Sequence, residues 1–275
     1  MVPEAEGLND AHMQKIAAEA TVFETAFVFD SSPDDVKVRY FTPHLEIPFA
    51  GHATIATATM MVHEGKCISC RSPITIDFEF NIGLLPVEIT IDPADNSVEA
   101  LMTQQNPSFG GTDDKDDLME WLGLNSSDFF KGLPIQVINT GVPFLMAPVN
   151  GMAILKKLCL NRSLVRALLE RLGVDTVYLF CLEGFSQEGD ASGRLLTPAS
   201  GAEAPCTGFA VSSMGAYIGK YKLLTGLVFT AEPGHLLGRP GKATVGTIGS
   251  NTDIDAVRGG GSAVETQAGQ AFVNH

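Results

Sequence analysis

Two stretches of this chain repeat one another, so its fold must accommodate the same local structure twice. Residues 39–54 read RYFTPHLEIPFAGHAT, and residues 194–211 read RLLTPASGAEAPCTGFAV. Seven positions are identical once the second copy is allowed two extra residues. They are Arg39, Thr42, Pro43, Glu46, Pro48, Gly51 and Ala53, matched by Arg194, Thr197, Pro198, Glu203, Pro205, Gly208 and Ala210. A duplicated order of motifs predicts two similar halves.

Each copy lies in the same predicted order of elements: helix, strand, loop, strand, and a helix that begins at glycine. ETAFVF at residues 24–29 is similar to DTVYLF at residues 175–180. A helical spacing of apolar residues precedes both, after the N-cap candidates Asn9 and Asn161, and the second run ends at Gly173. The apolar positions are Met13, Ile16, Ala17 and Ala20, and then Leu164, Leu168, Leu169 and Leu172. We expect an α/β (α+β) fold of two pseudo-symmetric lobes with a ligand cleft between them.

The remaining segments complete two sheet-rich lobes. Alternating apolar residues over 74–92, interrupted at Asn81-Ile82-Gly83, predict a β-hairpin. Acidic residues over 113–122 open a short helix, and a last strand is expected after Gly259-Gly260-Gly261. Further strands are expected at residues 135–140, 144–149, 227–231 and 243–248. We assign residues 1–107 to the first lobe, rejoined by 262–275, and residues 108–261 to the second.

The composition suits a globular protein that binds a small molecule. The chain is 45% hydrophobic and 18% charged, with a formal net charge of −14. Nucleic acids and anionic membranes recruit Lys/Arg surfaces, so neither is an expected partner. No apolar run approaches the ~20 residues of a membrane span, and no signal-peptide pattern opens the chain. We therefore expect a cytoplasmic protein with a small-molecule substrate.

The cysteines and glycines carry weaker signals. Five cysteines in 275 residues do not indicate a disulfide framework, and Cys67-Ile68-Ser69-Cys70 lacks the second pair of a zinc site. A two-thiol racemase needs one cysteine in each repeated loop. Cys206 occupies the second loop, but the first has Phe49-Ala50 before Gly51. No glycine-rich phosphate-binding motif is present, so nucleotide cofactors are not expected.

Candidate site residues lie where the repeated loops enter their helices. Gly51 and Gly208 open apolar segments over 51–62 and 208–218, which we expect to be buried central helices. The free N–H groups of such helix starts can bind a carboxylate, although ordinary helix capping is the alternative. His52 lies at the first of these starts. Glu24 opens an apolar strand between Phe23 and Phe27, surroundings that would raise a carboxyl pKa and suit an acid/base, although a solvated strand end is the alternative.

Six motifs occur in an order that resembles the phenazine-biosynthesis PhzF-like family. They are FETAFV (23–28), RYFTP (39–43), E-x-PFAGHAT (46–54), TGVPFLMAPV (140–149), GRPG (238–241) and GGSAV (260–264). The resemblance implies a diaminopimelate-epimerase-like fold, in which each lobe is a barrel-like sheet around a central helix. It also implies a cofactor-independent, metal-free enzyme, commonly a homodimer. The namesake of the family isomerises a dihydro-hydroxyanthranilic acid through a proton-moving glutamate.

The resemblance assigns roles to particular residues. It places the acid/base glutamate on Glu24, the Gly-His pair on Gly51 and His52, and the second-loop glycine on Gly208. Substrate-binding positions are Gly51, Ala53, Ala204, Thr207, Gly208 and Phe209. Ala204 replaces the family's aspartate and Phe209 its small hydroxyl residue, so half of the polar site becomes apolar. The family's opening strand, about two dozen residues, has no counterpart here. A truncated chain or a sheet one strand short would explain this, and a partner chain could cover the exposed edge.

Two functions remain open at this stage. The retained Glu24 and His52 favour an isomerase that acts by glutamate acid/base proton transfer on a small carboxylate-bearing or cyclic metabolite, in specialised metabolism. The changes at Ala204 and Phe209 and the missing strand favour a catalytically silent relative that binds a ligand or partner. Turnover of a co-purifying ligand would discriminate between them.

Overall fold

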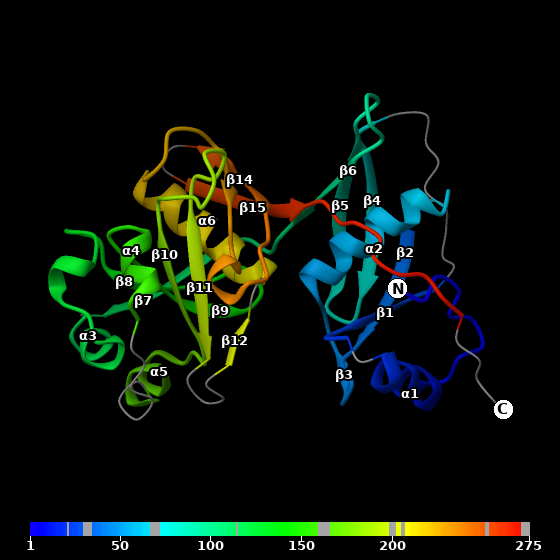
Figure 1. Cartoon of the computed structure of the whole chain (residues 1–275), viewed down its shortest axis with the longest axis horizontal. Coiled ribbons are helices and arrows are strands. Elements are labelled where there is room, and N and C mark those ends of the chain that lie inside the picture. The colour runs from blue at the N-terminus through cyan, green and yellow to red at the C-terminus, as the bar shows by residue number, and fades with distance from the viewer. Residues whose placement is uncertain are drawn as a thin grey trace. The chain divides into compact units, whose positions relative to one another are not determined.

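The computed structural model describes residues 1–20, 22–29, 35–66, 72–113, 115–158, 166–197, 202–204, 207–250 and 253–270. The chain divides into two compact units, which Figure 1 shows in colour from the N- to the C-terminus. The first unit comprises Met1–Thr103 and Gly260–His275, and the second comprises Gln104–Gly259. The chain therefore passes from one unit to the other twice.

The first unit is a mostly antiparallel sheet with one long helix against it. Its elements are α1 (Asp10–Ala20), β1 (Thr25–Phe29), β2 (Asp35–Phe41), β3 (Glu46–Ile47), α2 (Gly51–His63), β4 (Ile74–Phe80), β5 (Gly83–Ile91) and β6 (Val98–Thr103). The strand order is β1-β2-β4-β5-β6, with β3 paired to β2, and only β2 and β4 run parallel. Helix α2 packs against β1, β5 and β6. Its buried side chains are small or unbranched, so the helix can lie close to the sheet.

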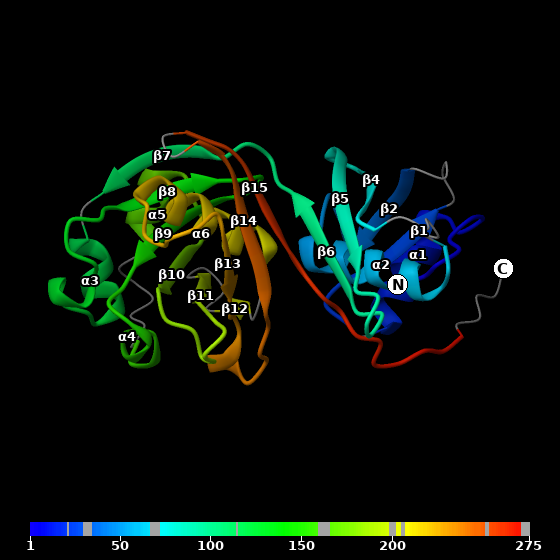
Figure 2. The ribbon, with the colours of Figure 1, turned by 90° about the horizontal axis from the view of Figure 1, so that it is seen from above.

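The second unit has a six-stranded sheet and a further set of strands, β13 to β15, on either side of another central helix. Its elements are β7 (Ser108–Asp113), α3 (Asp116–Leu122), β8 (Ile135–Asn139), β9 (Pro143–Pro148), α4 (Met152–Lys156), α5 (Arg166–Leu172), β10 (Val177–Cys181), β11 (Ser192–Thr197), β12 (Ala202–Ala204), α6 (Gly208–Tyr221), β13 (Val228–Ala231), β14 (Ala243–Ser250) and β15 (Asp253–Gly261). Short 3-10 helices span Ser126–Asp128 and His235–Leu237. The six-stranded order is β12-β11-β10-β9-β8-β7. Helix α6 packs against β8, β9 and β10 on one side and β14 on the other (Figure 2).

The predicted α/β fold with a central helix in each half is confirmed. Both segments expected to be central helices, 51–62 and 208–218, lie within α2 and α6. The described strands form open sheets with no closed barrel among them. No helix within the described ranges is long and apolar enough to cross a membrane.

Several local predictions are also confirmed by specific contacts. The His12 N–H donates to Asn9 Oδ1 at 2.9 Å, which caps α1 as the sequence indicates. The hairpin β4–β5 turns at the predicted residues, since Phe80 pairs with Gly83. Helix α5 ends before Gly173, which has the left-handed φ of 67° expected of a C-terminal glycine. Asn161, the predicted cap of that helix, lies outside the described residues.

The prediction of a last strand after Gly259-Gly260-Gly261 is wrong. Gly259, Gly260 and Gly261 are the end of β15, and residues 262–270 form neither helix nor strand. The reason is close packing: a Cβ on Gly260 would collide with the backbone carbonyl of Ala100. Glycine is therefore required here for the approach of two backbones inside a sheet, not for a turn.

The outer edge of β1 is occupied by the chain itself. Val2 pairs with Phe27, and its backbone bonds with Ala26 and Val28 at 2.7 and 3.0 Å. The Ala5 N–H donates to the Val28 carbonyl at 3.0 Å. The edge that the sequence left open to a partner chain is thus hydrogen-bonded to residues near the N-terminus.

The two repeated loops contain the same ionic clasp. In the first unit, Arg39 Nε and Nη2 donate to the Glu46 carboxylate at 2.8 and 2.7 Å. In the second unit, Arg194 donates to Glu203 through the same two nitrogens at 2.9 and 2.6 Å. Each arginine lies on the strand before its loop, and each glutamate lies on the short strand before the central helix. The structure therefore places these aligned residues in equivalent local settings.

The register of the preceding strands corrects the sequence alignment by one residue. Arg39 lies opposite Phe27, whereas Arg194 lies opposite Leu179. The alignment of ETAFVF with DTVYLF matched Phe27 to Tyr178 instead. A slip of one residue exchanges the two faces of a strand. Tyr178 accordingly packs beside α6, while Phe27 packs on the face away from α2.

Candidate functional site

Glu24 and His52 meet where two neighbouring elements of the first unit begin. Glu24 directly precedes β1, His52 is the second residue of α2, and β1 packs against α2. Glu24 Oε2 lies 2.6 Å from His52 Nε2. The carboxylate side chain is 19% exposed and the imidazole 51% exposed. The two residues that the sequence singled out for catalysis thus form one close pair, reached from solvent on the imidazole side.

The pair is a close contact between a carboxylate oxygen and a ring nitrogen, without hydrogen-bond alignment. Glu24 Oε2 is buried and, within the described part of the chain, accepts no hydrogen bond. Catalytic contacts are often poorly aligned without ligand and tighten when substrate binds. This oxygen therefore has unused hydrogen-bonding capacity beside the imidazole.

Phe23 and Phe27 do not enclose the carboxylate, contrary to the sequence prediction. Successive side chains along a strand point to opposite faces, so Glu24 shares its face with Ala26 and Val28. Those two residues pack in the core cluster that includes α2, whereas Phe27 packs with residues of α1. Phe23 is 66% exposed. Residues adjacent in sequence were assumed to be neighbours in space, and strand alternation separates them.

Each central helix begins without a side-chain cap. Ala50 precedes α2 and has no capping oxygen, and the Thr207 hydroxyl before α6 makes no capping hydrogen bond. The first N–H groups of a helix have no partner within it, and the helix dipole is positive there. Gly51 and Gly208 begin the helices and leave the backbone unshielded by a side chain, while Ala53 is buried beneath the first turn of α2. Both starts are suited to bind an anion.

The start of α6 carries an aromatic ring where the start of α2 carries the imidazole. Phe209 follows Gly208 as His52 follows Gly51. A Cβ on Gly141 would collide with the Phe209 ring, so the ring lies directly on that glycine. Thr140 Oγ1 also lies 3.4 Å from the Phe209 carbonyl oxygen, to which it donates. The ring is thus held in place.

The other predicted positions are only partly described. Ala204 is the last residue of β12, opposite Leu195 of β11. Cys67, Cys70 and Cys206 lie outside the described residues. Among the residues that the structure does describe, no group of three or more His, Cys, Asp or Glu side chains could hold a metal ion.

Sequence reasoning missed a buried tyrosine within the electrostatic influence of Glu24. The Tyr40 hydroxyl lies 2.9 Å from Thr54 Oγ1, and the tyrosine is 1% exposed. Burial is the largest cause and raises the pKa of Tyr40, hydrogen bonding with Thr54 and Thr57 lowers it, and the charge of Glu24 raises it further. Only the alternation of β2 could have indicated that Tyr40 points toward α2.

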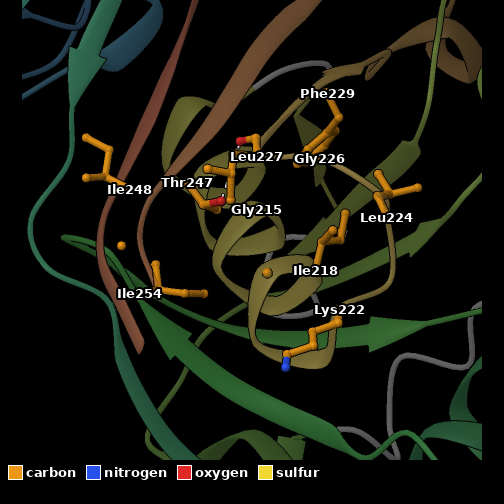
Figure 3. Close-up of a pocket in the computed structure, with 12 residues that line it drawn as sticks. Gly215, Ile218, Lys222, Leu224, Gly226, Leu227, Phe229, Thr247, Ile248 and Ile254 are labelled. Carbon is orange, nitrogen blue, oxygen red and sulfur yellow. Dashed lines mark hydrogen bonds between the residues drawn. The ribbon is translucent and has the colours of Figure 1, made fainter. Parts of the chain in front are cut away.

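The cavity drawn in Figure 3 lies away from the start of α6. It has a volume of about 260 Å³ and is lined from the later turns of α6, from the segment 224–229, and from residues 247–249 and Ile254. Gly215 and Gly219 form its helical wall, and Ile218, Phe229 and Ile254 are among its apolar walls. Because Gly208 is not part of the lining, this cavity and the helix start are separate features of the second unit.

The fold defined above is that of racemases and epimerases. A probable proline racemase from Agrobacterium radiobacter aligns with a TM-score of 0.58 over 100% of this chain and 88% of its own. The identity is 14%, so this likeness shows the fold alone.

The family follows from closer matches. The model of the family described as phenazine biosynthesis-like protein matches residues 1–269, and the chain belongs to that family. An uncharacterized isomerase of Clostridium acetobutylicum is 32% identical over 251 residues, which cover 88% of this chain and 81% of the relative. A PhzF-family phenazine biosynthesis protein from Bacillus anthracis aligns with a TM-score of 0.84 at 26% identity, covering 98% and 91% of the two chains. The resemblance drawn from the sequence motifs is confirmed, and the chain is an isomerase.

Proposed function

We propose that this isomerase moves a proton between two positions of a small carboxylate-bearing or cyclic metabolite, in specialised metabolism. Glu24 is the acid and base, and His52 orients the substrate or assists the transfer. The observation that carries the proposal is the 2.6 Å contact of Glu24 Oε2 with His52 Nε2 at the uncapped start of α2. A positioned carboxylate of this kind supplies about 10²–10⁴-fold in rate.

The proposed reaction needs no co-reactant. The Glu24 carboxylate takes a proton from a substrate carbon, and the electron pair of that C–H bond forms a new C=C bond. The electrons of the old double bond then take the proton back from the carboxylic acid at a different carbon. Atoms and electrons balance, and Glu24 returns to its starting state. The buried Oε2, which accepts no hydrogen bond from the described residues, supports this role.

The start of α2 supplies the proposed anion-binding group. A substrate carboxylate would accept hydrogen bonds from the free N–H groups after Ala50, near Gly51 and His52. Such a helix end favours a negative charge by roughly 0.3–1 kcal/mol, and by more where it is partly buried. The methyl group of Ala53, in the first turn of α2, would limit the size of the substrate group that binds there.

The start of α6 has different binding chemistry. Thr207 and Gly208 leave the same kind of free N–H groups, but the residue after Gly208 is the apolar Phe209, and position 204 is alanine where the family has aspartate. The immobilised Phe209 ring supports a substrate that is less polar than a simple dicarboxylic acid. The silent-relative alternative has less support, because curated relatives of this length are named isomerases.

The experiment begins with native mass spectrometry, which identifies what co-purifies with the protein. Turnover of that compound in D₂O should place deuterium at the carbon that receives the proton, to the extent that the proton on Glu24 exchanges with solvent before it is returned. The Glu24→Gln variant keeps the shape of the side chain and should lose about 10²–10⁴-fold in rate at an unchanged melting temperature. Equal rates for wild type and variant would show that Glu24 is not the base.

A matched control removes a carboxylate elsewhere in the same unit. Glu79 is paired with Lys37 at 3.0 Å on the surface, and its side chain is 49% exposed. Glu79→Gln should leave turnover unchanged. If wild type fails to turn over any co-purified ligand, the silent binding protein becomes the better explanation.

A further inference from the structure

A chain of buried hydroxyl groups ends at the first turn of α2. The Tyr40 hydroxyl and Thr54 Oγ1 are 2.9 Å apart, and Thr54 Oγ1 is 2.9 Å from the carbonyl oxygen of Ala50. A carbonyl oxygen only accepts, so the single hydroxyl proton of Thr54 must point to Ala50. Tyr40 must therefore donate its own proton to Thr54. The direction of the chain, from Tyr40 through Thr54 to Ala50, follows from this count of donors.

The series of hydrogen-bonded hydroxyl groups ends at Ala50, the residue that immediately precedes helix α2. The Ala50 carbonyl accepts both the N–H and the hydroxyl of Thr54, each at 2.9 Å. Ala50 makes no side-chain cap, so these two bonds from one residue hold the turn that contains His52. First turns of helices fray easily when they are not held.

Core packing fixes Tyr40, the first group in this series of hydroxyls. Tyr40 is 1% exposed, and its ring stacks on Phe80 with centroids 5.9 Å apart. It lies on β2 directly opposite Ala26 of β1, two residues after Glu24. The same pair of strands therefore positions Glu24 directly and His52 through the hydroxyl chain.

The direction of the hydrogen bond from Tyr40 to Thr54 also affects the Glu24 carboxylate. Burial keeps the pKa of Tyr40 far above its ordinary value, so the phenol remains a donor at any working pH. Because its proton is directed to Thr54, it is not donated to Glu24, although the phenol lies within the electrostatic influence of that carboxylate. The buried Oε2 is thereby left for His52 and the substrate.

We propose that Tyr40 is a positioning residue, which holds His52 against Glu24 through Thr54 and Ala50 and directs its own proton away from the carboxylate. This inference rests on the proposed function of the pair, but it can be tested without turnover. Four substitutions separate the hydroxyl chain from ordinary packing: Tyr40→Phe, Thr54→Val and Thr54→Ser in the first unit, and Tyr217→Phe as a control.

The control matches Tyr40 closely. Tyr217 lies on α6 in the second unit, is fully buried, and donates its hydroxyl proton to the Pro134 carbonyl at 2.6 Å. Tyr217→Phe thus removes a buried, hydrogen-bonded phenol hydroxyl that has no path to His52. Thr54→Val keeps the shape of the side chain and removes the hydroxyl, whereas Thr54→Ser keeps the hydroxyl.

The readout is the ¹⁵N spectrum of histidine-labelled protein, in which His52 is assigned among the six histidines by its loss in His52→Gln. Tyr40→Phe and Thr54→Val should move the His52 ring signals toward those of a freely exposed imidazole. Thr54→Ser and Tyr217→Phe should retain the wild-type signals. With a turned-over ligand, kcat should fall about 10- to 100-fold in the first two variants while KM changes little.

The outcomes distinguish the two proposals. If the His52 signals of both Tyr40→Phe and Thr54→Val equal those of wild type, Tyr40 contributes only to core packing, and the inference is overturned. Signals that move equally in Thr54→Ser would overturn it too, since the hydroxyl would then be irrelevant. If the signals move as expected but Glu24→Gln retains full activity, the positioning contact stands and the proposed function fails.

Discussion

In the first unit, the chain passes from β2 through the Arg39–Glu46 clasp into α2, and in the second it passes from β11 through the Arg194–Glu203 clasp into α6. Both clasps are doubly hydrogen-bonded, and both helices begin at glycine without a side-chain cap. The framework that delivers the two helix starts is thus the same.

The chemistry at the two starts differs. At α2, Glu24 and His52 form a close pair, and the charge of Glu24 acts on a buried tyrosine, Tyr40. At α6, a phenyl ring lies on a glycine, and the buried hydroxyl pair is Thr140 with Ser213, 3.1 Å apart. This contrast indicates that the clasp and the helix start are requirements of the fold, whereas the proposed proton transfer depends on a few side chains in the first unit.

The largest expected effect tests whether the chemistry belongs to the first unit alone. Glu24→Gln should raise the barrier by about 3–5 kcal/mol, the equivalent of 10²–10⁴-fold in kcat. His52→Ala should lose less and also weaken binding. By strand register the counterpart of Glu24 in the second unit is Thr176, and Thr176→Val should leave kcat within about twofold. A large loss in Thr176→Val would contradict the division of roles.

The two clasps should differ in their contribution to stability. Arg194 and Glu203 are each 16% exposed, and Arg194 also donates to the Leu155 carbonyl at 2.6 Å. Arg194→Met leaves the Glu203 charge largely enclosed without its partner, at a cost of about 2–3 kcal/mol. Chemical denaturation monitored by circular dichroism measures this loss.

The corresponding change in the first unit should cost less. Glu46 is 27% exposed and keeps a second donor, Asn81 Nδ2 at 3.0 Å, when Arg39 is removed. The second carboxylate partner of Arg39 is Asp10, whose side chain is 81% exposed and readily hydrated. Arg39→Met should therefore cost about 1–2 kcal/mol. Equal losses in the two variants would show that burial does not distinguish the clasps.

The first clasp should also depend on pH. Hydrogen bonding from Arg39 holds the pKa of Glu46 below its ordinary value of 4.5, so the folded state binds this proton less readily than the unfolded state does. The clasp therefore contributes fully above pH 4.5, and its contribution is lost as the pH falls further. Glu46→Gln should cost about 1 kcal/mol at pH 7 and less at pH 3. Denaturation curves at both values, with Glu79→Gln as the surface control, test this.

The sequence predicted the helices, caps and turns better than it predicted the surroundings of the candidate site residues. Helix periodicity, the Asn9 cap and the Asn81–Gly83 turn depend on local preferences, and all agree with the structure. The glycines at 259–261 led to a wrong prediction, because glycine occurs both in turns and where two backbones lie close together. Only the contact with Ala100, which is distant in sequence, distinguishes the two cases.

The surroundings of Glu24 could not be read from its sequence neighbours. Phe23 and Phe27 flank it along the chain, but the strand turns them to the opposite face. Tyr40 and Thr54, which are hydrogen-bonded to each other, come from another strand and from the helix itself. Aligned motifs gave Glu24 and His52 as candidates, while their contact and its support depend on tertiary structure.

A smaller effect concerns ligand preference at the start of α6. Phe209→Ser removes the ring that covers Gly141 and restores a small hydroxyl group, so small polar acids should bind more tightly, by roughly twofold to fivefold. Isothermal titration calorimetry with a series of small carboxylic acids measures the change. Unchanged or weaker binding would show that Phe209 does not limit this site. His52→Phe, which imposes the α6 chemistry on α2, should shift preference in the opposite direction.

The smallest effect tests whether the starts of the two central helices are really uncapped. Asn9 caps α1 through the His12 N–H at 2.9 Å, so Asn9→Ala should cost about 1 kcal/mol. Thr207 stands at the same position relative to α6, but its hydroxyl makes no capping hydrogen bond. Thr207→Ala should therefore cost less than about 0.5 kcal/mol, below the usual loss for a threonine cap. The free energies of unfolding of both variants, measured in parallel, provide the test. A loss in Thr207→Ala as large as that in Asn9→Ala would mean that the hydroxyl caps α6 in solution, and one N–H group would then be withdrawn from any bound anion.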